Sequence, residues 1–190
     1  MKMWITSTLT AALLSQGALA SSPADGPPDA TLRSSSGDEV RLSKWRGKPV
    51  ILFYEDKDST TLNAGLKEEL FARGKERNLL GSAWVVAVAN LRKFDFFPAR
   101  QIALSYVRDE EKKAGVPILV DMDGTMGSAP WGLPMKTSNV LLLDAQGAVV
   151  YRYSGKMKPE EQVAFFSALS TLVGVDLNTP AAPKAPGATP

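Results

Sequence analysis

Two aspartates separated by one residue form the pattern in this chain whose residue types and spacing could do chemistry. They are Asp121 and Asp123, which follow the apolar run Pro117–Val120 and precede Gly124 and Thr125. An aspartate at the end of an apolar strand, with a second carboxylate two residues on, suits Mg²⁺-assisted phosphoryl transfer. A Ca²⁺ site would need more donors than these two carboxylates, because Ca²⁺ takes about 6–8 oxygen ligands.

The segment Ile118–Met126 resembles the first motif of the haloacid-dehalogenase phosphatases. The resemblance implies that Asp121 would be the nucleophile and Asp123 the acid/base, both near Mg²⁺. In that family the motif opens the domain and several βα units follow it, whereas here residues 126–190 contain a hairpin instead. The other interpretation is a turn, in which Asp and Gly are favoured for local hydrogen bonding and positive φ. We favour the turn, because a motif depends on its structural context.

The composition excludes several other kinds of chemistry. The chain of 190 residues contains no cysteine and no histidine, so thiol exchange, thiol peroxidation, Cys/His metal sites and Ser-His triads all lack their reactive groups. A net charge of +2 with scattered Lys and Arg argues against nucleic-acid binding, which needs a concentrated basic surface. The proportions of apolar and charged residues are those of a folded globular protein.

The order of predicted elements is that of an α/β domain. Short or apolar runs predict strands at Thr31–Ser34, Glu39–Leu42, Pro49–Tyr54, Ala83–Ala89, Pro117–Val120, Asn139–Leu143 and Ala148–Tyr153. Helical spacing predicts helices with the apolar faces Leu62/Leu66/Leu70, Ala99/Ile102/Ala103/Tyr106/Val107 and Val163/Phe166/Leu169, the last two starting at Pro98 and Pro159. This order predicts a central mixed sheet with helices on both faces and an N-terminal β-hairpin extension.

Two long segments resemble the thioredoxin-like superfamily, in its redoxin branch. They are Leu42–Asp58 (LSKWRGKPVILFYEDKD) and Gly115–Gly155, which contains the run TSNVLLLDAQG. The resemblance covers about residues 30–173 and is greatest to the YtfJ-like periplasmic proteins, around DSTTLN and TSNVLLLDAQG. It implies a thioredoxin-like fold, and it brings no settled activity with it.

The same resemblance locates the redox site of the superfamily in this sequence. The C-x-x-C motif falls on residues 58–61, which here read Asp58, Ser59, Thr60 and Thr61, and the cis-proline position falls on Ser138. Because the nucleophile there must be a thiolate, the chain is not expected to be a disulfide oxidoreductase. One interpretation is that Asp58, Ser59 and Thr60 cap the following helix. The other is a polar recognition patch on the face where relatives bind extended peptides, made of Glu55, Asp56, Asp58, Thr60, Thr61 and Ser138.

The aromatic residues suggest core packing with one alternative. Trp84 and Trp131 are expected to line the core or a pocket, and Trp45 to cover a turn. Phe94, Phe96 and Phe97 lie beside a helix start. They are expected to pack in the core, or else to form an exposed apolar binding patch.

The ends of the chain have the composition of targeting and tail segments. Lys2, the apolar run Trp4–Leu14 and Ala18-Leu-Ala20 predict a signal peptide over residues 1–20, cleaved after Ala20. Its apolar run is too short to span a bilayer, which needs about 20 residues. Residues 21–29 are predicted to be a linker, 30–175 the domain, and 176–190 a disordered Pro/Ala-rich tail.

These observations predict an exported, non-catalytic thioredoxin-like binding or accessory protein without a cofactor. Its partner would be a protein or peptide of the cell envelope, bound at residues 58–61 and Ser138. The alternatives are an Mg²⁺-dependent phosphatase that uses Asp121, and a purely structural envelope component.

Overall fold

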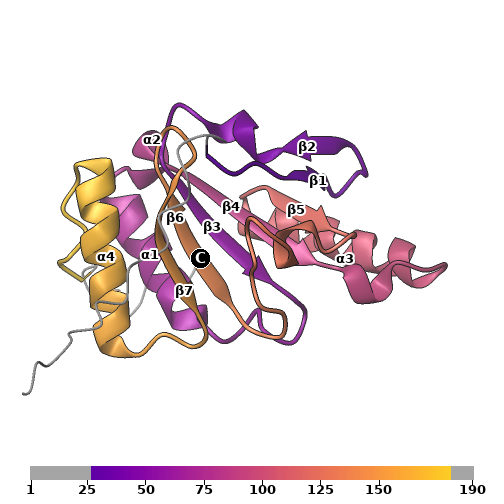
Figure 1. Ribbon diagram of the computed structural model, residues 1–190. Helices are drawn as coiled ribbons and strands as arrows, with labels where there is room; N and C mark the ends of the chain where they lie inside the picture. Colours follow the sequence, from indigo (N-terminus) through magenta and orange to yellow (C-terminus); the bar gives the residue numbers. More distant parts are fainter. Residues whose placement is uncertain (1–26, 181–190) are drawn as a thin grey trace, which may run out of the picture.

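Seven strands form one mixed sheet in the computed structural model, which describes residues 27–180 (Figure 1). The strands are β1 (Thr31–Arg33), β2 (Glu39–Arg41), β3 (Val50–Glu55), β4 (Trp84–Asn90), β5 (Ile118–Asp121), β6 (Asn139–Leu143) and β7 (Val149–Ser154). Their order in the sheet is β2-β1-β5-β4-β3-β6-β7. The helices are η1 (Leu42–Trp45), α1 (Ala64–Glu76), α2 (Leu79–Ser82), η2 (Arg92–Phe94), α3 (Ala99–Ala114), η3 (Thr125–Gly127) and α4 (Pro159–Val173), where η marks a 3₁₀ helix. The predicted mixed sheet and its N-terminal hairpin extension are confirmed.

Strand β3 lies in the interior of the sheet, with parallel β4 on one side and antiparallel β6 on the other. All six of its residues are buried, which is why its sequence is a continuous apolar run rather than an alternating one. Strands β3, β4 and β5 are parallel to one another, so their carboxyl ends meet at one edge of the sheet. That edge is where residues 55–61 begin.

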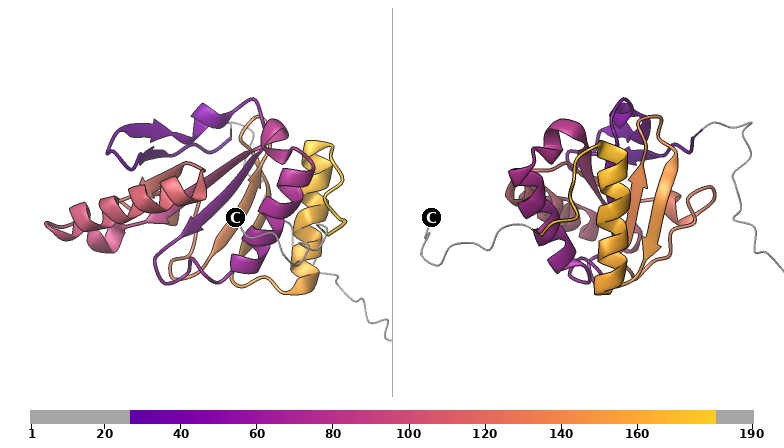
Figure 2. Two further views of the ribbon diagram at one scale, coloured as in Figure 1. Left: turned by 180° about the vertical axis from the view of Figure 1, so that it is seen from behind. Right: turned by 90° about the vertical axis from the view of Figure 1, so that its left-hand side faces the viewer.

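One face of the sheet is covered by α1, α3 and α4, which lie in front of the strands in the left-hand view of Figure 2. Ile51, Phe53, Val140 and Leu142 point to this face and pack with the helical residues Leu66, Leu70, Phe165, Phe166 and Leu169. Because β3-α1-β4 and β4-α3-β5 step along the sheet in the same direction, right-handed crossovers bring both helices to the same side.

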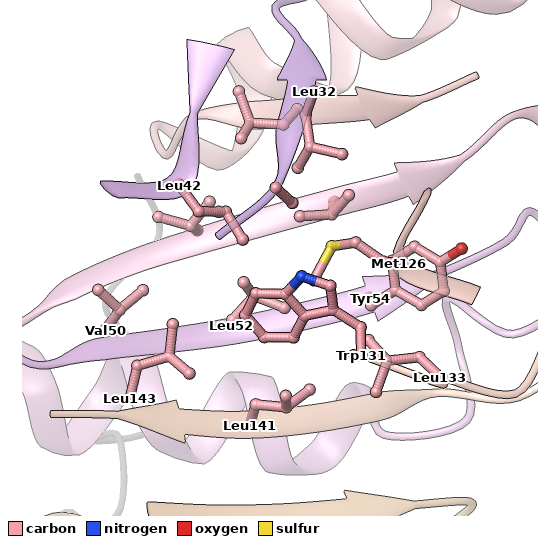
Figure 3. Close-up of a cluster of buried hydrophobic side chains, with 14 of the residues drawn as sticks. Leu32, Leu42, Val50, Leu52, Tyr54, Met126, Trp131, Leu133, Leu141 and Leu143 are labelled. Carbon is pink, nitrogen blue, oxygen red and sulfur yellow. The ribbon is translucent and has the colours of Figure 1, made fainter. Parts of the chain in front are cut away.

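The opposite face is covered by the 3₁₀ helices η1 and η3 and by the segment that follows β5 (Figure 3). Trp131 lies over the middle of the strands, against Leu52 and Leu141, and its indole N–H donates to the carbonyl oxygen of Asp29 at 3.1 Å. Both faces of the sheet are therefore closed, and Trp131 is a core residue as predicted.

Several predicted apolar faces differ from the observed ones. Helix α4 buries Phe165, Phe166 and Leu169, whereas Val163 is exposed because it lies about a third of a turn from the centre of that stripe. Helix α3 starts beside Pro98 as predicted, but of its residues Val107 alone is fully buried, so Ile102 and Tyr106 face outward. Trp84, at the start of β4, is also partly exposed and is not a core residue.

The described parts of the predicted linker and tail pack against the domain. The Asp29 carboxylate accepts hydrogen bonds from the backbone N–H groups of Ala30 and Ser43, both at 2.9 Å. Leu177 is fully buried, and its carbonyl oxygen accepts a hydrogen bond from Arg73 at 2.5 Å. Leu177, which lies in the predicted tail, therefore packs with the domain. The predicted signal peptide and residues 181–190 lie outside the described residues.

Within residues 27–180, none of the helices combines the length and the apolar character that a bilayer-spanning segment needs.

Candidate functional site

Residues 58–61, on which the resemblance places the C-x-x-C motif, lie in the turns between β3 and α1, and not in the helix. Helix α1 begins at Ala64, after Asn63, so Asp58, Ser59 and Thr60 do not cap it as one interpretation predicted. The reason is a local one: the Ser59 hydroxyl is 2.9 Å from Asp56 Oδ1 and 2.9 Å from the Asp56 backbone N–H. These contacts close a turn that delays the start of the helix.

Behind this turn lies a buried hydrogen-bond network, next to the residues on which the resemblance places the redox site of the superfamily. The Ser138 hydroxyl, directly before β6, donates to Glu55 Oε1 at 2.6 Å. Asn63 Nδ2 donates to Ser138 Oγ at 3.0 Å and to the Gly155 carbonyl at 2.8 Å, and its Oδ1 accepts from the Met157 backbone N–H at 2.9 Å. The network thus joins the end of β3, the start of α1, the start of β6 and the loop before α4.

Lys67 neutralises the carboxylate in this network. Its Nζ lies 2.6 Å from Glu55 Oε2 and 2.9 Å from the Thr60 carbonyl oxygen. The Glu55 side chain is largely buried, so an ion pair and the Ser138 hydroxyl together satisfy both of its oxygens. Every buried side-chain nitrogen and oxygen in residues 27–180 has a hydrogen-bond partner. The buried polar groups of the network therefore satisfy one another.

The loop before β6 is held to the same turn from outside. Asp56 Oδ2 accepts a hydrogen bond of 2.8 Å from the backbone N–H of Lys136, a residue with a φ of 60°. The other carboxylate oxygen, Asp56 Oδ1, accepts a hydrogen bond from the Ser59 hydroxyl. Asp56 therefore fixes the position of residues 134–138 relative to residues 56–61.

The predicted binding residues divide into buried and exposed ones. Ser59 and Ser138 are fully buried, so neither can touch a partner directly. Asp58, Thr60 and Thr61 are exposed, and so are Lys57 and Lys136 beside them. We call the exposed residues Lys57, Asp58, Thr60, Thr61 and Lys136 the turn surface. It carries both signs of charge and no nucleophilic thiol.

The two aspartates of the phosphatase-like motif lie in different environments. Asp121 is buried, and its Oδ1 accepts from the Thr125 backbone N–H at 2.8 Å. Its Oδ2 accepts from the Met126 backbone N–H at 3.0 Å and from the Tyr54 hydroxyl at 3.1 Å. Asp123 is exposed. Both Asp121 oxygens thus stabilise the turn that starts η3.

The contact with Asp121 changes the acidity of Tyr54. Burial of the phenol, followed by the negative charge of Asp121 and the hydrogen bond to it, raises the pKa of Tyr54 well above its ordinary value of 10.0. The phenol therefore stays protonated as the donor to Asp121 across the physiological range.

The described residues contain two small hollows and no cluster of metal-ligating side chains. Among residues 27–180, no three Asp, Glu, Cys or His side chains gather in a way that could hold a metal ion. Hollows beside η1 and beside Asp121 have volumes of about 10 Å³ and 30 Å³, enough for a water molecule each.

Two residues of the network were missed by sequence reasoning, Asn63 and Lys67. Asn63 has a signal that could have found it, since an asparagine five residues after Asp58 is itself a favoured helix-start residue. Lys67 has no such signal, because its partner Glu55 is twelve residues away and meets it through the tertiary fold.

The sequence is similar to chloroplastic peroxiredoxins Q. It is 27% identical to the protein of Triticum aestivum over 146 residues, which are 72% of this chain and 61% of that one. A second relative, from Oryza sativa subsp. japonica, is 26% identical over 145 residues. The chain spans about three fifths of the length of these curated relatives. No family model matches the sequence.

Solved structures of thioredoxin-like proteins share the fold. A protein from Chlorobium tepidum described as a putative thiol:disulfide interchange protein DsbE superposes with a TM-score of 0.56 at 19% identity, over 79% of this chain and 96% of that one. The exposed lipoprotein thioredoxin of Streptococcus pneumoniae gives 0.54 at 20% identity, over 76% and 100%. Peroxidoxin BcpB of Mycobacterium tuberculosis gives 0.52 at 22% identity, over 80% and 96%. The chain therefore has the thioredoxin-like fold of the redoxins, as the sequence predicted.

Proposed function

We propose that this chain is an exported, non-catalytic thioredoxin-like protein that binds a protein or peptide of the cell envelope through its turn surface. The observation that carries the proposal is the closed network of Glu55, Ser138, Asn63 and Lys67 behind that surface. In a redox protein of this fold, a reactive thiolate is needed near this point. Here the chain has no cysteine, and the polar groups satisfy one another.

The turn surface is held in a fixed shape from below. The contacts of Asp56 with Ser59 and with Lys136 hold residues 56–61 and 134–138 in one arrangement. A surface whose shape is set in advance loses little conformational entropy when a partner binds. The exposed Lys57, Asp58 and Lys136 offer charges of both signs, and Thr60 and Thr61 offer hydroxyl groups to an extended peptide.

Export is supported by the leader-like composition of residues 1–20 and by the kind of protein that shares the fold. One solved structure with this fold is described as an exposed lipoprotein, from Streptococcus pneumoniae. The leader itself lies outside the described residues. N-terminal sequencing of the protein recovered from the cell envelope tests this part of the proposal: a chain that begins at Ser21 supports it, and one that retains Met1 contradicts it.

Phosphoryl transfer through Asp121 has no structural observation in its favour. The carboxylate is buried, and its two oxygens accept three hydrogen bonds from Thr125, Met126 and Tyr54. A nucleophilic aspartate needs a free oxygen facing the phosphorus atom. We therefore retain the binding protein as the proposed function.

The proposed binding surface can be tested by site-specific photo-crosslinking in cells. A photoreactive amino acid at exposed Thr61 would report contacts of the turn surface, and the same probe at exposed Gln146 would serve as control. Gln146 lies in the β6–β7 turn, at the other end of β6 from Ser138. We expect a discrete adduct from position 61 and none from position 146.

The adduct partner, once identified by mass spectrometry, allows a quantitative test with purified proteins. Asp58→Lys and Lys136→Glu reverse exposed charges on the turn surface, and we expect each to raise the dissociation constant at least about tenfold, the effect of losing one charge-assisted contact. Asp38→Lys, an exposed change in the β1–β2 turn, should leave the constant unchanged. Equal adducts from positions 61 and 146, or no effect of either charge reversal, would contradict the proposal.

A further inference from the structure

Met135 directly precedes Lys136 of the turn surface, and its side chain lies at the surface of the protein. Met135 is 49% exposed, whereas Met122, Met126 and Met157 are 7%, 0% and 3% exposed. Each of these three buried methionines packs in a different hydrophobic cluster of the core. Among the methionines of residues 27–180, Met135 is therefore the one that a solute in the surrounding water can reach.

The backbone on both sides of Met135 is fixed by side chains of other parts of the fold. The Pro134 carbonyl oxygen accepts a hydrogen bond of 3.0 Å from Asn139 Nδ2, and the Lys136 N–H donates to Asp56 Oδ2 at 2.8 Å. Lys136 has a φ of 60°, a conformation that a residue with a side chain keeps only where its surroundings hold it. The exposure of Met135 is therefore a property of a firmly held loop.

Met135 supplies an apolar side chain to a surface that is otherwise polar. The five residues of the turn surface carry charges or hydroxyl groups. Of the exposed large apolar side chains in residues 27–180, Met135 alone lies within residues 55–61 or 134–138. Interfaces between proteins place apolar contacts inside a polar rim, and the flexible, polarisable thioether of methionine adapts to many partner surfaces. A partner bound at the turn surface would thus meet Met135 as its apolar contact.

The same thioether is open to oxidation by hydrogen peroxide. The chain has no cysteine, so no thiol within it competes for the oxidant. In the reaction a lone pair of Sδ attacks one peroxide oxygen, and the S–O bond forms as the O–O bond breaks. The hydrogen on the transferred oxygen passes to the leaving oxygen, which departs as water. The sulfur loses two electrons and the peroxide gains them, so the step needs no further reactant.

We propose that Met135 is a site of oxidation by peroxide, and that its conversion to the sulfoxide weakens the binding of a partner at the turn surface. The sulfoxide is polar, so it loses the favourable burial that the thioether gains against an apolar partner surface. The hydrogen bonds that hold this loop use main-chain groups of Pro134 and Lys136, so oxidation of the side chain leaves them in place. The effect on binding rests on the proposed function, whereas the selective oxidation of Met135 does not.

Mass spectrometry of the folded protein during treatment with hydrogen peroxide tests the site itself. The gain of about 16 Da, the mass of one oxygen atom, is followed in the peptides that hold each methionine. We expect Met135 to be oxidised at least about tenfold faster than Met122, Met126 and Met157, because burial keeps the oxidant from these three. The same protein in urea is the control, and there the four rates should be alike. Four rates that are alike in the folded protein as well would overturn the proposal.

Met135→Leu separates the loss of the apolar contact from other effects of peroxide. Leucine is apolar and similar in volume to methionine but has no sulfur to oxidise. Each protein is treated, the peroxide is removed, and the partner identified by photo-crosslinking is then added. Treatment should raise the dissociation constant of the natural protein about tenfold, and that of Met135→Leu less than about twofold. Met122→Leu is the matched control, because it keeps Met135 and should respond to peroxide as the natural protein does.

Two further measurements show whether the effect arises at the surface. Met135→Gln imitates the polarity of the sulfoxide and should weaken binding without any peroxide. The Tm of the oxidised natural protein should stay within about 2 °C of the untreated one, since the core methionines are shielded. A larger fall that Met135→Leu prevents would show that oxidation acts through the fold, and it would overturn the proposed effect on binding.

The results distinguish this inference from the proposed function. If Asp58→Lys and Lys136→Glu weaken binding but oxidation does not, the turn surface binds its partner and the role of Met135 is wrong. If peroxide weakens the binding of Met135→Leu as much as that of the natural protein, another residue is responsible and the inference also fails. If neither charge reversal changes binding, the proposed function fails and the effect of Met135 on it fails too, whatever the rate of oxidation.

Discussion

Asn63→Ala is the substitution that tests most directly whether the buried network holds this end of the fold together. Asn63 makes two donor contacts, to Ser138 Oγ and the Gly155 carbonyl, and one acceptor contact, to the Met157 N–H. Alanine leaves the buried Met157 N–H and the Gly155 carbonyl without these partners, while Ser138 keeps its bond to Glu55. Each buried polar group left unsatisfied costs about 1–3 kcal/mol.

The expected loss is therefore about 2–4 kcal/mol of unfolding free energy, with about 1–3 kcal/mol from the buried Met157 N–H and about 1 kcal/mol from the half-buried Gly155 carbonyl. For a domain of this length, each kcal/mol lowers Tm by about 2–4 °C, so Tm should fall by about 5–15 °C. Urea unfolding followed by circular dichroism measures the free energy, and a calorimeter measures Tm. The control is Thr60→Ala, an exposed change in the adjacent turn, which should stay within about 0.5 kcal/mol of the natural protein.

Two further variants make the test more specific. Asn63→Asp keeps an acceptor for Met157 but places a carboxylate beside the Gly155 carbonyl and near Glu55, so it should cost at least as much as alanine. Ser138→Ala combined with Asn63→Ala should cost less than the sum of the single changes, because the two side chains share a hydrogen bond. If Asn63→Ala costs no more than Thr60→Ala, the network does not stabilise the fold and our explanation of the site is wrong.

Three other substitutions follow from buried contacts elsewhere in the fold. Tyr54→Phe removes the hydroxyl from Asp121 and should cost about 1 kcal/mol at neutral pH. Burial and then Asp121 raise the pKa of Tyr54 above 10.0. The protonated phenol therefore stabilises the fold below pH 10.0, and this contribution is lost as the pH rises further. The natural protein should thus lose stability above pH 10.0 more steeply than Tyr54→Phe does. Burial raises the pKa of Asp29, but hydrogen bonds from Ser43 and Ala30 outweigh it and hold that pKa below 3.8. The contribution of Asp29 to stability is thus present above pH 3.8 and lost as the pH falls below 3.8. In acid-unfolding curves, Asp29→Asn should lose less stability below pH 3.8 than the natural protein does. Curves of equal slope would refute this role of Asp29. Trp131→Ala removes the buried indole over Leu52 and should cost about 3–5 kcal/mol in urea unfolding, whereas a loss below about 1 kcal/mol would show that the face is not packed as described.

The order of secondary structure was largely predictable because it depends on short-range patterns. Continuous apolar runs gave β3, β4 and β6, and the turn residues Asp144 and Gly147 located the hairpin between β6 and β7. In that turn Asp144 Oδ1 accepts from the Ala148 N–H at 2.8 Å, and Gly147 has a φ of 93°. Both are local contacts that one stretch of sequence determines.

Helix faces and helix starts were less predictable, because neighbours far away in the sequence decide them. The predicted buried face of α3 was correct at Ala103 and Val107 but wrong at Ile102 and Tyr106, which are exposed. Leu104 packs inward beside Ala103 and Val107. The start of α1 was predicted at Asp58–Thr60 and lies at Ala64, since Ser59 bonds to Asp56 in place of capping a helix. In both cases more than one arrangement satisfies the local pattern.

The sequence by itself determined that thiol chemistry is impossible, because no cysteine is present, and it predicted the thioredoxin-like order of strands and helices. The tertiary structure alone decided which side chains meet behind residues 58–61. Ser138 meets Glu55 across 83 residues of sequence, and Asn63 meets Ser138 across 75. Such contacts depend on how β3, α1 and β6 come together in space, which no local spacing encodes. For the same reason, only the packed fold shows that Phe97, Ile102 and Tyr106 remain on the surface.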